Sequence, residues 1–376
     1  WEQLCHRSWS RSNEGCATCY DSSWQSCKKD MSQIVCKKCV MDKSAEEITF
    51  DENCVCNFCH MAEEELRNLG KLDLKSLVSR IKKEGRNKKY DCLIGLSGGV
   101  DSSYTLHEAV RLGLRPLCFS VDNGWQDPRA DENMMRLVEG LKVHFYRYTI
   151  NQKIFKDLQS AFMIAGQKNI EIPTDHILMA TTYEMAAKYK IKWILSGGNV
   201  ATESIMPASW GYQPRDIVHI KDIYKKIVGK DLKGLPLCSL LKWNYYKWIK
   251  GVKTAYLLDY VGYVREEAIK LLKDKYGYKP YGEKHCESTF TWWFQNFYLF
   301  EKFGIDKRKA HYSSLINSGQ LTRKEAMDKL TASPIYPQLG FERKVMMYDK
   351  RPYTDFKTDE KLFNFISSIV KKLRWN

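Results

Sequence analysis

The sequence predicts an α/β protein in which a doubly wound parallel sheet lies between a small cysteine-rich module and a mostly helical C-terminal region. Strand-length apolar runs alternate with amphipathic helical stretches over residues 89–205, two Cys-x-x-Cys pairs stand near the N-terminus, and the apolar periodicity weakens after Ser204. Strands and helices that alternate at this spacing are typical of a parallel sheet, whose ligands bind at the C-terminal ends of the strands.

The N-terminal part is expected to hold a metal. Residues 1–30 have neither helical nor strand period, and we interpret them as an extension or expression-derived tail outside the fold. Residues 31–62 contain two pairs in the pattern CxxC–x16–CxxC, a spacing typical of a zinc ribbon. Four thiolates leave no open coordination position, so the Zn²⁺ is structural. The expected ligands are Cys36, Cys39, Cys56 and Cys59.

The next segments lead into the sheet. Residues 63–88 are charged and lysine-rich, and we expect a helical connector there. The periodicity then predicts strands at 91–96, 115–121, 143–148 and 192–195, and helices near 102–112, 130–141, 152–165 and 175–189.

The stretch after the first of these strands is suited to binding an anion. An apolar run at 90–96 leads through a glycine pair into an amphipathic helix. Glycines let the backbone approach a phosphate, and the N–H groups at a helix start point toward it. An aspartate stands where the common nucleotide loop has its lysine, and beside a polyphosphate it must act through Mg²⁺. The expected nucleotide ligands are Ser97, Gly98, Gly99, Val100, Asp101, Ser102 and Ser103.

The motif SGGVDSS at 97–103 resembles the loop of the PP-loop ATP pyrophosphatases. This resemblance implies a PP-loop domain of the adenine nucleotide alpha-hydrolase-like type at 89–205, cleavage of ATP between its α- and β-phosphates, and adenylation of a substrate oxygen. It also implies that the turn after the second strand contacts the nucleotide, which makes Asp122 and Asn123 candidate ligands. An ordinary polar turn is the alternative, because Asx-Gly turns are common.

A second glycine pair closes a later strand, in SGGNVATE at 196–203. Gly197, Gly198 and Asn199 are further candidate nucleotide ligands. Asp101 and Glu203 could flank the pyrophosphate and share Mg²⁺. The adenylated oxygen should then meet the α-phosphate near Ser97 and Gly198, and the predicted catalytic residues are Ser97, Asp101 and Glu203.

Residues 206–376 are expected to form a mostly helical substrate-binding region. Aromatics and lysines alternate over 216–278, which we interpret as helices and loops over the mouth of the sheet, and a buried helix should begin near Ser288. The polar groups around that helix could bind a sugar: Lys284, His285, Glu287, Ser288, Arg308 and His311. As an alternative, 307–309 is only a solvated helix start and Glu287 or Ser288 a helix cap.

The zinc ribbon, SGGVDSS, SGGNVATES, HCESTFT and FGIDKRKAHYSSLINSGQLTRKEA together resemble, over residues 32–376, the N-acetyl sugar amidotransferases. Membership of this family would imply that ATP adenylates the carbonyl oxygen of the N-acetyl group of a nucleotide-activated sugar, and that ammonia displaces AMP. The acetamidino sugar would enter the O-antigen of lipopolysaccharide or flagellin-type glycans. A separate glutaminase subunit would supply the ammonia, since the chain has no glutaminase nucleophile motif.

Composition leaves other classes open. The net charge of +15 favours polyanionic ligands, of which nucleic acid is only one. The lack of a long apolar run and the lysine-rich composition predict a cytoplasmic protein without a membrane span. A PP-loop tRNA thiolase with a zinc ribbon is the main alternative, but after the loop only Cys118, Cys238 and Cys286 remain, without any CxxC. A non-enzymatic ATP-binding adaptor is the third interpretation.

Overall fold

A computed structural model describes residues 35–211, 214–282, 284–359 and 361, so the predicted extension at 1–30 lies outside the described residues. The chain divides into two compact units. The first, here called the cysteine unit, contains the described residues up to Gly70 together with Val200–Gly211 and Ile305–Ser333. The second, the sheet unit, contains the described residues of 71–199, 214–304 and 334–361. The units interleave along the sequence, and the domain boundaries expected above stay a prediction.

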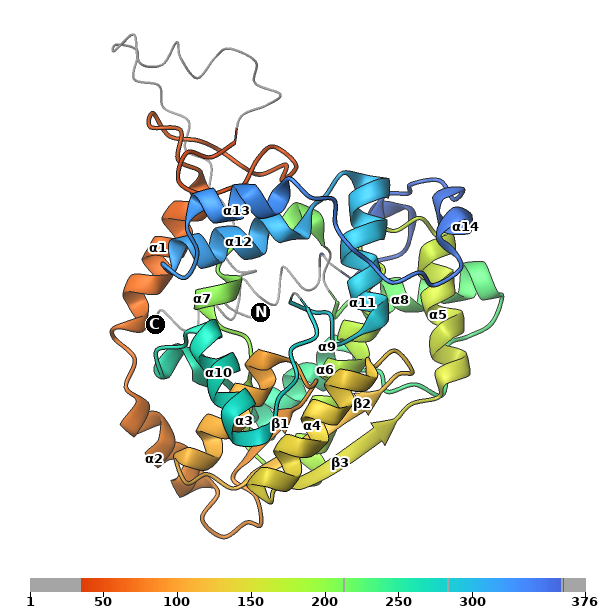
Figure 1. Ribbon diagram of the computed structural model, residues 1–376. Coiled ribbons are helices and arrows are strands. Elements are labelled where there is room, and N and C mark those ends of the chain that lie inside the picture. The colour runs from red at the N-terminus through yellow and green to blue at the C-terminus, as the bar shows by residue number, and fades with distance from the viewer. Residues whose placement is uncertain (1–34, 212–213, 283, 360, 362–376) are drawn as a thin grey trace. The chain divides into compact units, whose positions relative to one another are not determined.

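The sheet unit is built on five parallel strands in the order β3-β2-β1-β4-β5. Of these strands, β1, β2 and β3 are labelled in Figure 1. Its strands are β1 Cys92–Gly95, β2 Pro116–Asp122, β3 His144–Thr149, β4 Trp193–Ser196 and β5 Lys253–Tyr256. The connecting helices are α3 Val100–Arg111, α4 Pro128–Leu141, α5 Gln152–Ile164 and α6 Ile172–Lys188. The predicted fold class is confirmed, and β1 to β4 each lie within one residue of the expected bounds.

Side chains that alternate along the strands feed two cores, one on each face of the sheet. In β1, Cys92 and Ile94 join a core with Leu106 of α3 and Met134 of α4, whereas Leu93 joins the opposite core. That second core takes helical side chains from α5 and α6, and also Trp243 and Tyr246 from the later helical segment 240–249. Because both faces are covered there, β1, β2 and β4 read as nearly continuous apolar runs, which is why the sequence located them well. The edge strand β3 has no buried residue.

The strand β5 was not predicted. Residues 253–256 pair in parallel with β4 at the sheet edge, where helices and loops were expected. Of its four residues only Ala255 is buried and Lys253 is exposed, so the segment lacks the apolar run that marked the other strands. The remaining elements of this unit are helical: α2 Leu74–Glu84, α8 Ile217–Val228, α9 Leu240–Asn244, η3 Tyr245–Ile249, η4 Leu257–Tyr260, α10 Arg265–Tyr276, α11 Thr289–Trp293, η5 Phe294–Lys302, α14 Glu342–Met346 and η6 Tyr353–Asp355.

The strand order fixes where a ligand can bind. The chain moves outward from β1 to β3, then returns to place β4 on the other side of β1. The connections that follow β1 and β4 therefore lead toward opposite edges of the sheet. In open α/β sheets the ligand crevice forms between two such strands. One glycine pair follows β1 and the other follows β4.

The cysteine unit combines segments from distant parts of the sequence. Its elements are α1 Asn57–Leu69, α7 Val200–Glu203, η2 Ala208–Trp210, α12 Lys307–Asn317 and α13 Arg323–Leu330. A small core of Val40, Tyr312 and Ala326 joins the cysteine-rich loops to α12 and α13. In neither unit is any described helix long and apolar enough to cross a membrane.

Candidate functional site

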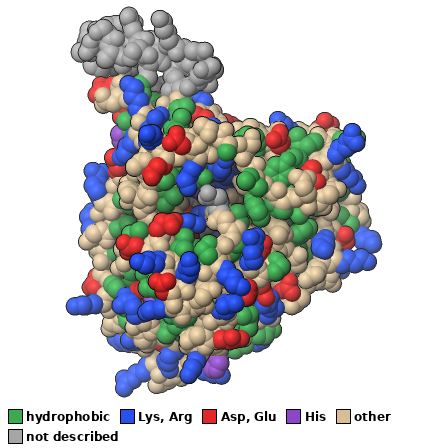
Figure 2. Space-filling model, viewed as in Figure 1, with side chains coloured by type: hydrophobic (Ala, Val, Ile, Leu, Met, Phe, Trp, Pro, Cys, Tyr) green, Lys and Arg blue, Asp and Glu red, His purple; other side chains and the backbone are tan. Residues whose placement is uncertain are grey.

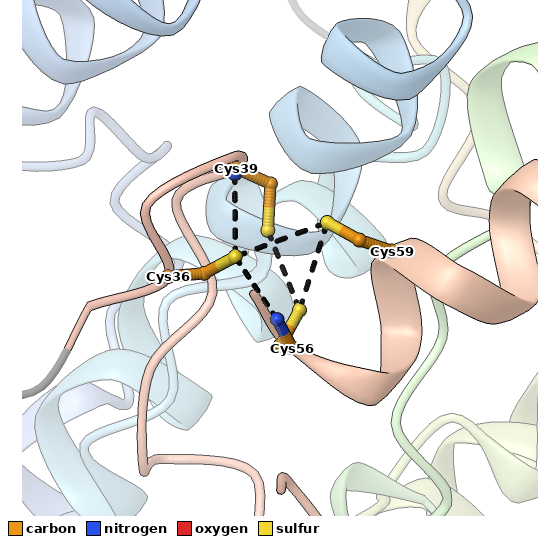
Figure 3. A group of neighbouring side chains, drawn as sticks. All are labelled: Cys36, Cys39, Cys56 and Cys59. Carbon is orange, nitrogen blue, oxygen red and sulfur yellow. Dashed lines mark hydrogen bonds between the residues drawn. The ribbon is translucent and has the colours of Figure 1, made fainter. Parts of the chain in front are cut away.

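The four predicted zinc ligands are brought together. The thiols of Cys36, Cys39, Cys56 and Cys59 point toward one another (Figure 3), and all four side chains are buried. The sulfur–sulfur distances are 3.9 Å for Cys36–Cys59, 3.7 Å for Cys39–Cys56 and 3.7 Å for Cys56–Cys59. Four sulfurs bound tetrahedrally at about 2.3 Å from a zinc ion would stand about 3.8 Å apart. The donor set and its dimensions therefore fit a structural Zn²⁺.

Backbone donors around the cluster stabilise negative charge on Cys36 and Cys39, whereas hydrogen bonds with the other cysteines, Cys36 foremost, raise the pKa of Cys56 and Cys59. The backbone N–H groups of Cys39 and Cys56 donate to Cys36 Sγ at 3.4 and 3.3 Å, and Met41 N donates to Cys39 Sγ at 3.4 Å. Hydrogen bonds from the other cysteines, Cys39 foremost, lower the pKa of the Cys36 thiol.

Helices far along the sequence support the same cluster, which the sequence did not indicate. Asn317 of α12 donates to Cys59 Sγ at 3.4 Å, and Arg323 of α13 donates to the carbonyls of Cys36 and Cys39, each at 3.1 Å. Such outer contacts fix the orientation of metal ligands. The C-terminal helices of this unit therefore fold around the metal centre.

In the sheet unit, the loop between β1 and α3 needs glycine for two reasons. Gly98 has a φ of +81°, and a Cβ there would lie 2.1 Å from the carbonyl oxygen of Ala130. Hydroxyls brace the loop, because Ser102 Oγ donates to Gly99 O at 3.2 Å and accepts from Ser97 N at 3.2 Å. Ser103 Oγ is fully buried and has no hydrogen-bond partner among the described residues. A close backbone approach at a helix start, with an unsatisfied hydroxyl in its first turn, fits a phosphate ligand.

The second glycine pair lies against this loop. A Cβ on Gly197 would come within 2.9 Å of Ser102 N, so only glycine allows β4 and α3 to approach this closely. Gly198 N donates to Ser196 Oγ at 3.2 Å, and Asn199 Nδ2 donates to Gly197 O at 3.3 Å. The predicted convergence of the two glycine loops is therefore present. Glu203 ends α7 in the cysteine unit, and its sharing of Mg²⁺ with Asp101 stays a prediction.

Asp101, in the first turn of α3, is held by two side chains that come from far along the sequence. Lys284 Nζ donates to its Oδ2 at 2.8 Å, and the Tyr263 hydroxyl donates to its Oδ1. Burial acts to raise the pKa of Asp101, but the charge of Lys284 and these hydrogen bonds outweigh it and lower the pKa below its ordinary value. Asp101 is therefore an anion in the folded protein. Where it binds Mg²⁺, its hydrogen bonds with Lys284 and Tyr263 must be released.

The segment before α11 reaches over the loop. Residues 125–127 and 287–289 pair in antiparallel fashion, with Asp127 N donating to Glu287 O at 2.9 Å and Thr289 N donating to Trp125 O at 2.9 Å. This pairing places Glu287 Oε1 at 3.5 Å from Ser97 Oγ. The expectation that polar residues before the buried helix face the glycine loop is thus met by Lys284 and Glu287.

Three residues that hold the loop were missed. Tyr281 and Tyr278 donate to Gly98 O at 3.0 and 3.3 Å, and Gln126 Nε2 donates to Ser97 O at 2.6 Å. The only sequence signal for the two tyrosines was the aromatic-rich composition near residue 278, and Gln126 had none.

Other candidates make structural contacts. Asp122 Oδ1 accepts from Gly124 N at 3.1 Å and Asn123 Oδ1 from Trp125 N at 3.1 Å, as the alternative of a polar turn predicts. Ser288 caps α11, since its Oγ accepts from Thr291 N at 3.3 Å. None of these contacts tests nucleotide or sugar binding, which stays a prediction for all three residues.

The remaining substrate candidates lie in different units. His285 is half-buried with a φ of +68° in the sheet unit. Arg308 and His311 belong to the cysteine unit, where Arg308 Nη2 bonds Asp306 Oδ2 at 2.7 Å and Nη1 bonds Ala332 O at 2.8 Å. Sugar binding by these residues also stays a prediction.

A cavity of about 460 Å³ lies at the C-terminal end of β3. Tyr148, Glu184 and Lys242 line it together with the loop 234–237, and Lys242 Nζ bonds Glu184 Oε1 at 2.6 Å. It is on the ligand-binding edge of the sheet, two strands from β1.

A family model matches the C-terminal part of the chain. Residues 287–350 match the family described as "LPS biosynthesis protein WbpG-like, C-terminal domain". The C-terminal part is WbpG-like. Glu287, which touches the glycine loop, is the first residue of the match. The chain matches none of the curated proteins.

Solved structures of low similarity were also found. NMN synthetase from Francisella tularensis is 16% identical, with 61% of this chain and 92% of that chain covered and a TM-score of 0.28. The U34-tRNA thiolase NcsA from Methanococcus maripaludis, with its [4Fe-4S] cluster, is 14% identical over 86% and 99%, with a TM-score of 0.34. NH3-dependent NAD synthetase from Campylobacter jejuni is 14% identical over 60% and 99%, with a TM-score of 0.28.

Proposed function

We propose that this protein is an ATP-dependent amidotransferase that replaces the N-acetyl carbonyl oxygen of a sugar, in nucleotide-activated form, with ammonia. The products are an acetamidino sugar, AMP and pyrophosphate. One observation carries the proposal: the region similar to a lipopolysaccharide biosynthesis protein begins at Glu287, and that residue lies 3.5 Å from Ser97 in the glycine loop expected to bind ATP.

The chain's own groups suit the adenylation step. The loop backbone and the start of α3 would receive the phosphates, and Asp101 would hold Mg²⁺, which neutralises charge on the departing pyrophosphate. When the metal binds Asp101, the Lys284 ammonium group would move from the Asp101 carboxylate to a phosphate oxygen. This exchange is favourable because the phosphate oxygen is also an anionic hydrogen-bond acceptor. Burial of the loop beneath Tyr278 and Tyr281 excludes water, which would otherwise hydrolyse the adenylate.

The chemistry needs no enzyme nucleophile. An amide carbon is a poor electrophile, and conversion of its oxygen to an adenylate supplies a leaving group. Positioning of the reactants and neutralisation of phosphate charge are then sufficient. Ammonia would come from a separate glutaminase subunit, which also forms part of the proposal.

The alternative of a tRNA thiolase is less well supported. Cys92, Cys118, Cys238 and Cys286 are buried and free, and burial raises the pKa of Cys118 to about 12 and that of Cys238 to about 11. A protonated, buried thiol is a poor sulfur carrier. Figure 2 shows basic and acidic side chains interspersed on the viewed face, with no continuous basic band for RNA.

The test is a product assay with ATP, Mg²⁺, ammonium and a panel of UDP- and CMP-linked N-acetyl sugars. We expect AMP, pyrophosphate and an acetamidino sugar, and we expect Asp101→Asn to lose AMP formation by at least about a hundredfold. Glutamine should replace ammonium only after a glutaminase is added. ADP and phosphate as products, or glutamine use by the chain alone, would refute the proposal.

A further inference from the structure

Two carboxylates lie at the glycine loop, and their surroundings differ. Asp101 is paired with Lys284 at 2.8 Å. Glu287 is the other, and among the described residues no lysine, arginine or histidine forms an ion pair with it. Its Oε1 is 3.5 Å from Ser97 Oγ and 3.2 Å from where a Cβ on Gly99 would stand. An unpaired anion beside a triphosphate site is unfavourable unless a cation arrives there during the reaction.

The proposed reaction supplies such a cation. Its substrate is a neutral acetamido group and its product is an acetamidinium ion. When ammonia attacks the adenylated carbon, the new C–N bond leaves a positive charge on the incoming nitrogen. That nitrogen must lose one proton before the C–O bond breaks and its electron pair leaves with AMP. This departure of AMP with the electron pair creates a new positive charge, delocalised over both nitrogens of the amidinium.

We propose that Glu287 is the general base of the amination step: it takes the proton from the attacking nitrogen, passes it to the phosphate of the departing AMP, and then, ionised again, pairs with the acetamidinium product. This inference rests on the proposed function and assigns a residue to its second half-reaction. A carboxylate can accept two parallel N–H bonds from an amidinium, as it does from an arginine guanidinium.

The electrostatics of the site suit this role. Burial raises the pKa of Glu287 to about 6, and the charge of Asp101 adds to the shift. A base with this pKa is ionised at neutral pH and more basic than an ordinary carboxylate, which favours proton transfer. The groups that face it are Asp101 on α3, Ser97 in the loop, Lys284, Tyr278 and Tyr281 on the preceding segment, and Glu171 before α6.

The backbone also holds Glu287 in place independently of its side chain. Its carbonyl accepts from Asp127 N, and the next residue caps α11. A Glu287→Gln substitution therefore preserves the main-chain contacts and the shape of the side chain, and it removes only the basic oxygen.

The experiment separates the two half-reactions. Sugar-dependent exchange of labelled pyrophosphate into ATP, without ammonia, reports adenylation; amidine formation with ammonium chloride reports both steps. For Glu287→Gln we expect exchange within about threefold of wild type and amidine formation lowered by about 10²–10⁴-fold. Glu287→Asp should recover part of the loss. Glu132→Gln, an exposed carboxylate on α4 paired with Arg136, is the matched control and should match wild type in both assays.

The pH profile gives a second readout. Ammonium deprotonation affects wild type and Glu287→Gln equally, so the ratio of their amidination rates isolates Glu287. This ratio should be constant above about pH 7 and fall up to tenfold per unit below about pH 6. An equal loss of exchange and amidination would make Glu287 a Mg²⁺ ligand instead, and unchanged amidination would exclude any role as a base; either result overturns the inference. Absence of sugar-dependent exchange in wild type would instead refute the proposed function.

Discussion

The pairing of Lys284 with Asp101 predicts a large stability effect from a single substitution at the glycine loop. In Lys284→Met the aliphatic stem is kept and the charge is removed. The side chains of Lys284 and Asp101 are only 11% and 19% exposed, so water can replace little of the lost interaction. The Asp101 carboxylate then keeps the Tyr263 hydroxyl but has lost its cation.

The magnitude follows from the distance and the burial. At the 2.8 Å separation of Nζ and Oδ2, two unit charges attract by about 6 kcal/mol at an effective dielectric constant of about 20. Desolvation of both groups cancels much of this in the intact pair. Removal of one partner from a buried pair costs about 3–5 kcal/mol, because the remaining charge is uncompensated. The remaining hydrogen bond from Tyr263 places the expectation near the lower end, at about 3 kcal/mol.

Urea unfolding at pH 8 measures this cost as a shift of the midpoint at constant slope. Lys279→Met is the matched control, because Lys279 pairs with Glu132 at 3.0 Å on the surface and its loss should cost at most about 1 kcal/mol. The double variant Lys284→Met/Asp101→Asn should be less destabilised than Lys284→Met alone. Equal midpoints for Lys284→Met and Lys279→Met would refute the reasoning.

The effect should also depend on pH. The pKa of Asp101 is lowered in the folded protein, so the stabilisation is fully present above the ordinary value of 3.8 and is lost as the pH falls through the folded value. The difference between wild type and Lys284→Met should therefore shrink in acid.

Two further predictions concern the metal and the sugar. Purified protein should contain one zinc per chain, and Cys56→Ser should lose it and unfold the cysteine unit, because structural zinc contributes about 10–16 kcal/mol; a metal assay that finds zinc retained would contradict this. Lys284→Ala should raise the Michaelis constant for the sugar nucleotide about tenfold or more, and Arg308→Ala should do the same if the tail binds its phosphates. If neither changes it, the cavity beside β3 becomes the site to test, through Lys242→Met.

Elements with local causes could be predicted from the sequence. The apolar runs of β1, β2 and β4 are largely buried, and the metal ligands follow from the spacing of two CxxC pairs. The edge strand β3 has no buried residue but is rich in aromatic side chains. The glycine loop is also local, because strand, turn and helix start lie within residues 92–111. The strand β5 failed because an edge strand with one buried side chain has no apolar run to detect.

The supports of the site could not be predicted, because they depend on contacts between distant segments. Tyr263 and Tyr281 reach Asp101 and Gly98 across 162 and 183 positions. Arg323 reaches the cysteine loops across 284. A lone tyrosine or arginine has no spacing pattern, and only the folded chain shows which of many such residues meets the loop.

In the sheet unit, the pairing of residues 125–127 with 287–289 connects two parts of the chain that are far apart in sequence. The first segment follows β2 and belongs to the part of the chain in which strands and helices alternate. The second segment begins the WbpG-like region. Because the pairing is made by backbone groups, it constrains the main chain and leaves the side chain at 287 to be set by the chemistry. The glycine loop, in contrast, is fixed by close contacts at Gly98 and Gly197 that permit no side chain. If evolution selects for a different nucleophile or acceptor substrate, the side chains at position 287 and its neighbours should therefore change. The residues of the glycine loop should stay the same, because the close contacts there permit no side chain.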